Sequence, residues 1–178
     1  MAKNSLKQIM EDEKKIIDQL SKNANKSINE IAKNCKFSRQ KVWRMIKNLE
    51  KNNTIWGYTA VIDERKQDLK SYIVLVKRTS QPLTKNVVEK ITKRELVKKS
   101  ASSGIRVHNS IYTNGFYDWI ICFSARDTRD AKRFVEDLNK LFEGYISEVQ
   151  LLEELFATEK CGIQNPNLDE LEQFFIDI

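Results

Sequence analysis

The chain contains 178 residues, of which 40% are hydrophobic and 31% are charged, and its formal net charge is +6. This length gives room for two small domains, and the composition is typical of a folded protein in water. No apolar run approaches the roughly 20 residues that a membrane helix needs, and the amino terminus lacks the apolar stretch of a secretory signal, so we expect a cytoplasmic protein without a membrane partner.

The first part of the chain is predicted to form a small helical core. Residues 13–20 carry apolar side chains on one helical face, as in a helix that covers a core. Ser27 and Glu30 have the spacing of a capping box at the start of a second helix, and Ser38 is placed to cap a third. Short helices in this order form a helix-turn-helix, whose second helix enters the DNA major groove. The apolar positions expected to face inward are Ile16, Ile17, Leu20, Ile28, Ile31, Ala32, Cys35, Val42, Ile46 and Leu49.

The outer face of the last of these helices is basic. Arg39 and Gln40 lie at its amino-terminal end, and side chains of these types form bidentate hydrogen bonds to guanine and adenine. Lys41, Arg44 and Lys47 supply positive charge that neutralises phosphates. A solvated basic helix on an ordinary domain has the same pattern, so this face alone does not decide between the two interpretations. The predicted DNA-binding residues are Ser38, Arg39, Gln40, Lys41, Trp43, Arg44 and Lys47.

Trp43 is unusual on an outward face that is otherwise polar. One interpretation is that the indole packs against the neighbouring helix. The other is an apolar contact with a thymine methyl group in the major groove. We favour packing.

The link before this helix and the segment after it both have recognisable turn chemistry. Lys36-Phe37 joins the two helices without a glycine, so Cys35 or Lys36 must adopt the bend itself. Asn53 is suited to the left-handed conformation after the last helix. Residues 55–62 alternate in polarity as a short extended strand or wing. A helix-turn-helix followed by such a segment is a winged-helix pattern.

The rest of the chain predicts six elements in the order β-α-β-β-α-β. The expected strands are residues 72–77, 106–113, 118–123 and 146–156, and the expected helices are residues 84–99 and 127–143. Asn114-Gly115 is a strong turn signal between the second and third strands. This order indicates a ferredoxin-like arrangement, an antiparallel sheet with both helices on one face. The fold class that we expect for the whole chain is α+β.

One face of such a sheet is left without helices. Val74, Val76 and Val149, or the residues that alternate with them, are available to this face. An apolar sheet face has to be covered, and a second copy of the chain is the simplest cover. We therefore expect a homodimer.

Charge is distributed unevenly along these segments. Residues 1–60 carry 13 Lys and Arg against 6 Asp and Glu, and residues 61–103 carry 11 against 5. The net charge is −3 over residues 104–156 and −4 over residues 157–178. A basic amino-terminal half suggests a polyanion-binding module joined to a module with another task. The expected domains are a winged helix-turn-helix (1–60), a linker (61–70), a ferredoxin-like domain (71–156) and an acidic, helical extension (157–178).

The acidic extension is predicted to form a helix that starts after Pro166, with Asn167 and Glu170 at its amino-terminal end. We favour a role in which this helix covers a hydrophobic edge of its own dimer. The alternative is that it bridges dimers or lies near the basic domain, where its negative charge weakens DNA binding. Its apolar side would consist of Leu168, Leu171, Phe174, Phe175 and Ile178.

The residues that most often carry chemistry are sparse. Cys35, Cys122 and Cys161 are far apart and lack the paired spacing of a zinc site, so free thiols are expected. His108 is the only histidine, and we favour a structural role for it. No acid–base pair or nucleophile constellation is visible. We therefore expect no catalytic residues, no metal, no cofactor and no enzymatic activity.

Taken together, several stretches resemble the leucine-responsive and asparagine-synthesis regulators, the Lrp/AsnC family of bacterial and archaeal transcription regulators. The matching stretches are residues 12–20, 27–49, 55–63 and 113–118. The resemblance covers about residues 10–156, and the combination is far more specific than any one stretch. It implies a winged-helix DNA-binding domain, a linking strand, and a ferredoxin-like domain for effector binding and oligomerisation.

The same resemblance implies a sequence-selective regulator that binds double-stranded DNA as a dimer, with further assembly to tetramers or octamers. Members of this family bind amino acids or related small molecules near the turn between the second and third strands. Two other functions stay open. One is an architectural protein that wraps DNA, and the other is a tetrapyrrole-decarboxylating enzyme of related fold, which His108 could serve. The implied effector-binding residues are Thr113, Asn114, Gly115, Phe116, Tyr117 and Asp118.

Overall fold

A computed structural model describes residues 6–176 and divides the chain into two compact units. The first unit combines residues 1–61 with residues 158–178, and the second contains residues 62–157. Within the described part of the chain, no helix is both long and apolar enough to cross a membrane.

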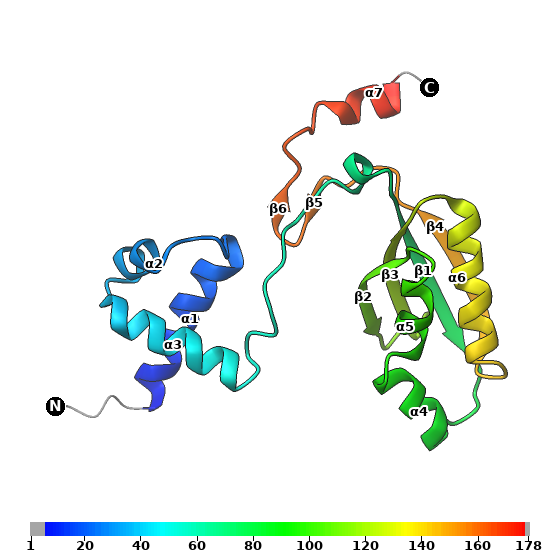
Figure 1. Ribbon diagram of the computed structural model, residues 1–178, viewed down its shortest axis with the longest axis horizontal. Helices are drawn as coiled ribbons and strands as arrows, with labels where there is room; N and C mark the ends of the chain where they lie inside the picture. Colours follow the sequence, from blue (N-terminus) through cyan, green and yellow to red (C-terminus); the bar gives the residue numbers. More distant parts are fainter. Residues whose placement is uncertain (1–5, 177–178) are drawn as a thin grey trace. The chain divides into compact units, whose positions relative to one another are not determined.

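The first unit is built on a core of three helices, which Figure 1 shows in blue and cyan. They are α1 (Leu6–Lys22), α2 (Ile28–Cys35) and α3 (Arg39–Lys51). The predicted helices are therefore present, and α1 begins seven residues earlier than its apolar pattern indicated. The buried side chains of this core are Ile16, Ile31, Ala32, Val42, Met45 and Leu49.

The predicted caps are confirmed. The Ser27 hydroxyl accepts a hydrogen bond from the Glu30 amide at 3.2 Å, and the Glu30 carboxylate accepts one from the Ser27 amide at 2.8 Å. Lys36 absorbs the bend between α2 and α3 with a φ of 56°, and Asn53 has a φ of 59°. Both residues adopt the left-handed conformation that the sequence predicted at these turns, where a glycine is absent.

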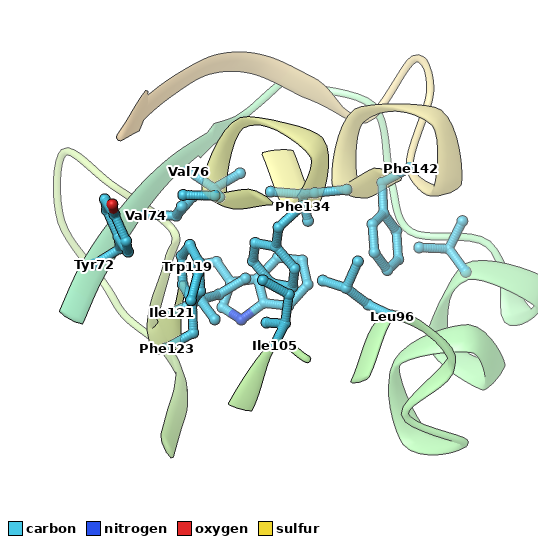
Figure 2. Close-up of a cluster of buried hydrophobic side chains, with 14 residues drawn as sticks. Tyr72, Val74, Val76, Leu96, Ile105, Trp119, Ile121, Phe123, Phe134 and Phe142 are labelled. Atoms are coloured by element: carbon cyan, nitrogen blue, oxygen red, sulfur yellow. The ribbon is translucent and has the colours of Figure 1, made fainter. Parts of the chain in front are cut away.

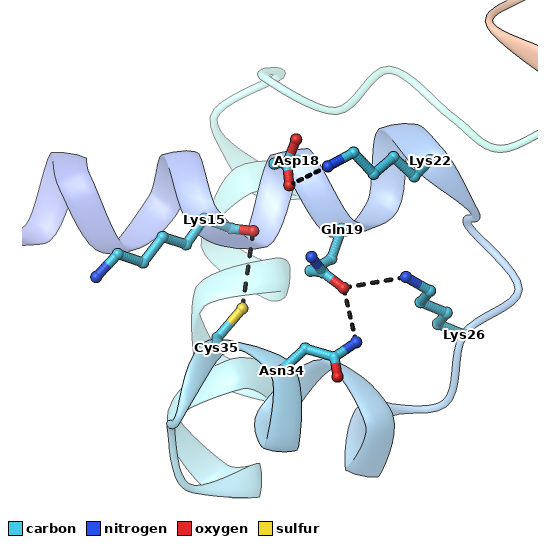
Figure 3. A network of polar contacts seen from close by, with 7 residues as sticks. All are labelled: Lys15, Asp18, Gln19, Lys22, Lys26, Asn34 and Cys35. Carbon is cyan, nitrogen blue, oxygen red and sulfur yellow. Dashed lines mark hydrogen bonds and ion pairs between the residues drawn. The ribbon is translucent and has the colours of Figure 1, made fainter.

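Polar contacts fix α1 against α2, as Figure 3 shows. The Gln19 side-chain oxygen accepts hydrogen bonds from Lys26 Nζ at 3.0 Å and from Asn34 Nδ2 at 2.8 Å. The Cys35 thiol points at the Lys15 carbonyl oxygen, 3.7 Å away. Burial raises the pKa of this thiol, so it stays protonated and behaves as a small packing group.

The wing strand predicted over residues 55–62 is not formed. Residues 55–61 have no helical or strand conformation in the structure. A strand exists only where its amides and carbonyls pair with another strand, and no described segment of this unit pairs with residues 55–61. Trp56 in this segment is 95% exposed.

The second unit has the predicted β-α-β-β-α-β order and is coloured green to yellow and orange in Figure 1. A short 3₁₀ helix, η1 (Glu64–Gln67), precedes its first strand. All three strand pairs are antiparallel, and the strand order is β2-β3-β1-β4. This confirms the ferredoxin-like α+β fold. The elements are β1 (Lys70–Arg78), α4 (Lys85–Thr92), α5 (Glu95–Ala101), β2 (Arg106–Tyr112), β3 (Trp119–Ala125), α6 (Thr128–Leu141) and β4 (Ile146–Glu153).

The prediction of a single helix over residues 84–99 is wrong, because this segment forms two helices, α4 and α5. Arg94 lies at the break with a φ of 55°, which ends one helix and starts the next. Both Val87 of α4 and Leu96 of α5 are buried in the core. The break lets both short helices turn an apolar side chain toward the sheet, and this packing outweighs the continuous helical pattern.

The core of this unit lies between the sheet and its helices, and Figure 2 shows its buried side chains. Val74 and Val76 are completely buried there, and Val149 packs against the same core. They therefore do not lie on the open face, so the first of the two alternatives expected from the sequence is wrong. The alternating residues form that face instead, because side chains one position apart point to opposite sides of a strand. Its apolar members are Ile73, Leu75, Ile111, Ile120, Cys122 and Leu152.

The carboxy-terminal segment contains a small hairpin that the sequence analysis missed. It consists of β5 (Glu159–Lys160) and β6 (Ile163–Gln164), and both residues of its turn, Cys161 and Gly162, have positive φ. Such a turn matches the twist of a two-residue hairpin. The predicted helix is present as α7 (Glu170–Ile176), which starts at Glu170. Ile178 lies outside the described residues.

Candidate nucleic-acid interface

α3 separates an apolar side from a polar side. Val42, Met45 and Leu49 are buried at i, i+3 and i+7, which fixes the helix on the core of the first unit. The residues on the opposite side remain exposed to solvent. They are Arg39, Gln40, Trp43, Arg44 and Lys47. We call these five residues the outer face of α3.

Ser38 sets where the helix begins. Its hydroxyl accepts a hydrogen bond from the Lys41 amide at 3.2 Å, which confirms the predicted cap. The side chain of Ser38 is thereby engaged in the helix, although the residue itself is exposed. Arg39 and Gln40 follow directly, in the first turn, where a helix lying in the major groove places its base-reading side chains.

Lys41 departs from the expectation that it projects outward. Its ammonium group pairs with the Asp12 carboxylate of α1 and lies 4.0 Å from the centre of the Phe37 ring. The Asp12 side chain is only 4% exposed, and Gln8 donates it a second hydrogen bond. The hydrogen bond from Lys41 holds the pKa of Asp12 below its ordinary value. Lys41 is thus a structural cation that neutralises a buried carboxylate, and it is not a free phosphate anchor.

The remaining cations of the outer face differ in their internal partners. Among the described residues, neither Arg39 nor Arg44 makes an ion pair. Lys47 pairs with Glu50 at 2.8 Å, and Glu50 raises the pKa of Lys47 through this hydrogen bond. The two arginines are therefore the cations most available to a phosphate backbone.

Trp43 is 53% exposed. The indole is therefore at most partly packed within the first unit, and the buried positions beside it are occupied by Val42 and Met45. The indole lies on the same side of α3 as Arg39 and Arg44. Such an apolar group within a cationic surface is suited to contact a base methyl group.

The turn between β2 and β3 carries the residues implied to bind an effector. The Thr113 amide donates to the Asp118 carbonyl at 2.9 Å, and the Thr113 hydroxyl donates to the Tyr117 carbonyl. The Asp118 carboxylate accepts a hydrogen bond from the Arg78 amide at 2.8 Å. These bonds tie the turn to the end of β1 and give it a defined shape.

The tip of this turn is exposed and aromatic. Phe116 is 66% exposed, its ring meets that of Tyr117 edge-on at 5.0 Å, and Lys77 Nζ lies 3.9 Å from its centre. A cation and an aromatic ring in contact suit a small molecule with both charged and apolar parts. Asn114 and Gly115 complete the turn.

His108 has a structural environment. Its Nε2 lies 3.1 Å from the Ser124 hydroxyl and 3.9 Å from the Glu64 carboxylate. Within residues 6–176, no cluster of histidine, cysteine and acidic side chains is able to hold a metal ion.

Comparisons with known proteins agree with this geometry. The family model described as winged helix-turn-helix DNA-binding matches residues 13–55. No curated protein matches the sequence. A Neisseria meningitidis transcriptional regulator solved as an L-Met complex has a TM-score of 0.63 at 19% identity, over 90% of this chain and 97% of that chain.

Two further solved structures have the same architecture. An AsnC-family transcriptional regulator from Agrobacterium tumefaciens has a TM-score of 0.62 at 17% identity, over 90% of this chain and 97% of that chain. The leucine response regulatory protein of Mycobacterium tuberculosis has a TM-score of 0.65 at 12% identity, over 84% of this chain and 94% of that chain.

Residues 13–55 of the first unit therefore match the winged helix-turn-helix DNA-binding model, although residues 55–61 form no wing strand among the described residues. The chain as a whole has the fold of the Lrp/AsnC transcription regulators, which confirms the resemblance seen in the sequence.

Sequence reasoning missed the buried ion pair beneath α3. The signal was present, because Asp12 lies one helical turn before Ile16 on the apolar side of α1. A carboxylate at such a position needs a positively charged partner. The sequence alone did not show which of the nearby lysines provides it.

Proposed function

We propose that the protein is a sequence-selective transcription regulator that binds double-stranded DNA through the outer face of α3. The observation that carries this proposal is the pair of arginines on this face, which have no internal ion-pair partner among the described residues, next to an exposed Trp43. Arg39 and Gln40 read base edges, and Arg44 anchors the phosphate backbone. Lys47 supplies weaker charge because Glu50 competes for it.

The regulator acts as a homodimer. The open face of the sheet supports this, because its central members, Ile73, Leu75 and Ile120, are only partly covered within one chain. Residues 55–61 add a second argument, since no strand of the described chain pairs with their backbone groups. A two-fold dimer places two copies of α3 in successive major grooves, about 34 Å apart. Larger assemblies, including tetramers and octamers, would be built from such dimers.

The turn between β2 and β3 binds an amino acid or a similar effector. Lys77 provides a cation for the effector carboxylate, and Phe116 provides an apolar surface. The solved Neisseria relative, a complex with L-Met, supports this class of ligand. Effector binding there changes assembly state or DNA affinity.

One experiment tests the proposal as a whole. Duplex fragments from a random library are retained on purified protein and sequenced, with and without a panel of amino acids, and their affinities are measured at physiological salt. We expect a shared, two-fold symmetric motif bound about 10³-fold more tightly than random duplex. Equal affinity for all fragments would contradict a regulator and favour an architectural protein. A spectral change on incubation with haem-type tetrapyrroles would instead favour the enzyme.

A further inference from the structure

The break between α4 and α5 leaves a cavity within the second unit. The cavity has a volume of about 300 Å³ and lies between these two helices and the strands β2 and β3. β2 is the edge strand of the sheet, and its inner side is only partly covered. Ser110 and Tyr112 of β2 are therefore exposed on the side that faces the helices.

The floor of the cavity is apolar. It includes Leu96, Trp119 and Phe142, three buried residues that are labelled in Figure 2. The Trp119 ring stacks on Tyr112 with centroids 5.1 Å apart and meets Phe142 edge-on at 5.3 Å. The Trp119 indole N–H donates to the Ser110 hydroxyl at 2.9 Å. A preformed aromatic floor of this kind binds flat or branched apolar groups.

The mouth of the cavity is positively charged. Lys90 and Arg94 line the cavity together with His108 and one carboxylate, that of Glu95. Lys90 Nζ donates one hydrogen bond, to the Leu141 carbonyl at 3.1 Å, which leaves two of its three protons available. Among the described residues, Arg94 makes no ion pair.

Arg94 also holds a backbone conformation that is unfavourable for a residue with a side chain. Its φ is 55°, and its side chain makes no capping hydrogen bond to α5. Left-handed residues other than glycine are uncommon. At Arg94 this conformation separates α4 from α5, and the residue lines the cavity at that point.

From this geometry we infer that the cavity binds a small monocarboxylate with an aromatic or branched apolar body. The apolar body lies on Trp119 and Leu96, and the carboxylate meets Lys90 and Arg94 at the mouth. This site is separate from the turn proposed to bind the effector, because none of residues 113–118 lines the cavity. It lies wholly within one protomer and does not depend on DNA binding.

Phenylacetate is a suitable probe, and Trp119 reports its binding. The protein contains three tryptophans, so the double variant Trp43→Phe/Trp56→Phe leaves Trp119 as the only one. We expect phenylacetate to change the Trp119 fluorescence in a saturable way. Phenylacetamide, which lacks the charge, and acetate, which lacks the ring, should each bind at least about tenfold more weakly.

Two substitutions in this background locate the ligand. Arg94→Gln should weaken phenylacetate binding about tenfold, whereas Arg129→Gln, an exposed arginine on α6, should leave it unchanged. Val97→Phe fills the cavity and should abolish binding. If Val97→Phe does not fold, the arginine pair and the three probes still decide. No saturable signal, or equal affinity for phenylacetamide, would overturn the inference.

A control separates this site from the proposed effector turn. Phe116→Ala removes the exposed ring of the turn and should leave phenylacetate binding intact. Loss of binding in Phe116→Ala with normal binding in Arg94→Gln would place the ligand at the turn and overturn the cavity assignment. It would leave the proposed effector turn standing.

Discussion

The outer face of α3 and the open face of the sheet are both surfaces that the single chain leaves uncovered. The first is cationic, with Arg39 and Arg44 lacking internal carboxylate partners among the described residues. The second has an apolar centre formed by Ile73, Leu75 and Ile120. Charge is compatible with water and apolar area is not, so the two surfaces require different partners.

Because of this difference, binding at the two surfaces should respond differently to salt concentration. Binding of DNA to the outer face of α3 is expected to weaken steeply with salt, because it releases counterions. Association through the open sheet face is expected to be nearly independent of salt, because it buries apolar area.

Leu75→Asp should give the largest effect. Leu75 lies on β1 in the middle of the open sheet face, and a carboxylate buried there without a partner costs about 3 kcal/mol or more. We expect the dimer dissociation constant to rise at least about 100-fold, as measured by analytical ultracentrifugation at two salt concentrations. Val88→Asp, on the solvent side of α4, is the matched control and should stay dimeric. A Leu75→Asp protein that remains dimeric would show that the dimer uses another surface.

Gln40→Ala should change specificity more than general affinity. Gln40 is exposed in the first turn of α3, where its amide can read one base. We expect a loss of about 1 to 3 kcal/mol at one base pair of the preferred site and little change on random duplex. The test is a titration against the preferred site and its single-base variants. An equal loss on all sequences would remove Gln40 from base reading.

Lys41→Met should reduce stability, because it removes the cation and keeps the packing of the stem. Asp12 then stays nearly buried without its ion pair, which is expected to lower the free energy of unfolding by about 1 to 2 kcal/mol. Urea denaturation followed by circular dichroism measures the change. Lys47→Met, which breaks the exposed pair with Glu50, is the control and should have little effect.

The effect of Lys41→Met on the free energy of unfolding should depend on pH. The folded protein lowers the pKa of Asp12 from its ordinary value of 3.8, so the ion pair contributes its full stability above that pH. This contribution is lost as the pH falls through the lowered pKa of the folded state. Stability should therefore decline less on acidification in Lys41→Met than in the unaltered protein. Parallel curves for the two proteins would show that the pair contributes nothing.

Arg44→Gln and Lys47→Gln form a pair with smaller expected effects. Arg44 has no internal ion pair among residues 6–176, whereas Lys47 already holds Glu50. We expect Arg44→Gln to weaken binding to all duplexes by about 1 kcal/mol and to lower the salt slope by about 0.9. Lys47→Gln should weaken DNA binding by less than this, because Lys47 has to give up its ion pair with Glu50 in order to contact a phosphate. A larger loss in Lys47→Gln would reverse the assignment.

Local chemistry made much of the first unit predictable. A capping box joins residues three positions apart, so Ser27 and Glu30 announce a helix start whatever surrounds them. The bend between two short helices without a glycine had to be adopted by Cys35 or Lys36, and Lys36 adopts it. The outer face of α3 followed in the same way, since burial of one side of a helix determines which side is left.

Features that depend on distant parts of the chain were harder to predict. Lys41 is separated from Asp12 by 29 residues, and only the packing of α1 on α3 brings them together. The break at Arg94 has no glycine or proline to mark it, because it results from the packing of two apolar side chains on one sheet. Residues 55–61 lack a strand partner among residues 6–176, so their extended pattern alone did not produce a strand.

The most direct test of the account is the binding of duplex DNA by the unaltered protein and by the double variant Arg39→Gln/Arg44→Gln. Fluorescence anisotropy of a labelled duplex is measured over a range of salt concentrations. We expect saturable binding that weakens with salt, and in the double variant both a lower affinity and a slope lower by about 0.9, which is the contribution of the phosphate anchor Arg44. Absence of binding to any duplex in dilute buffer, or an unchanged slope in the double variant, would contradict it.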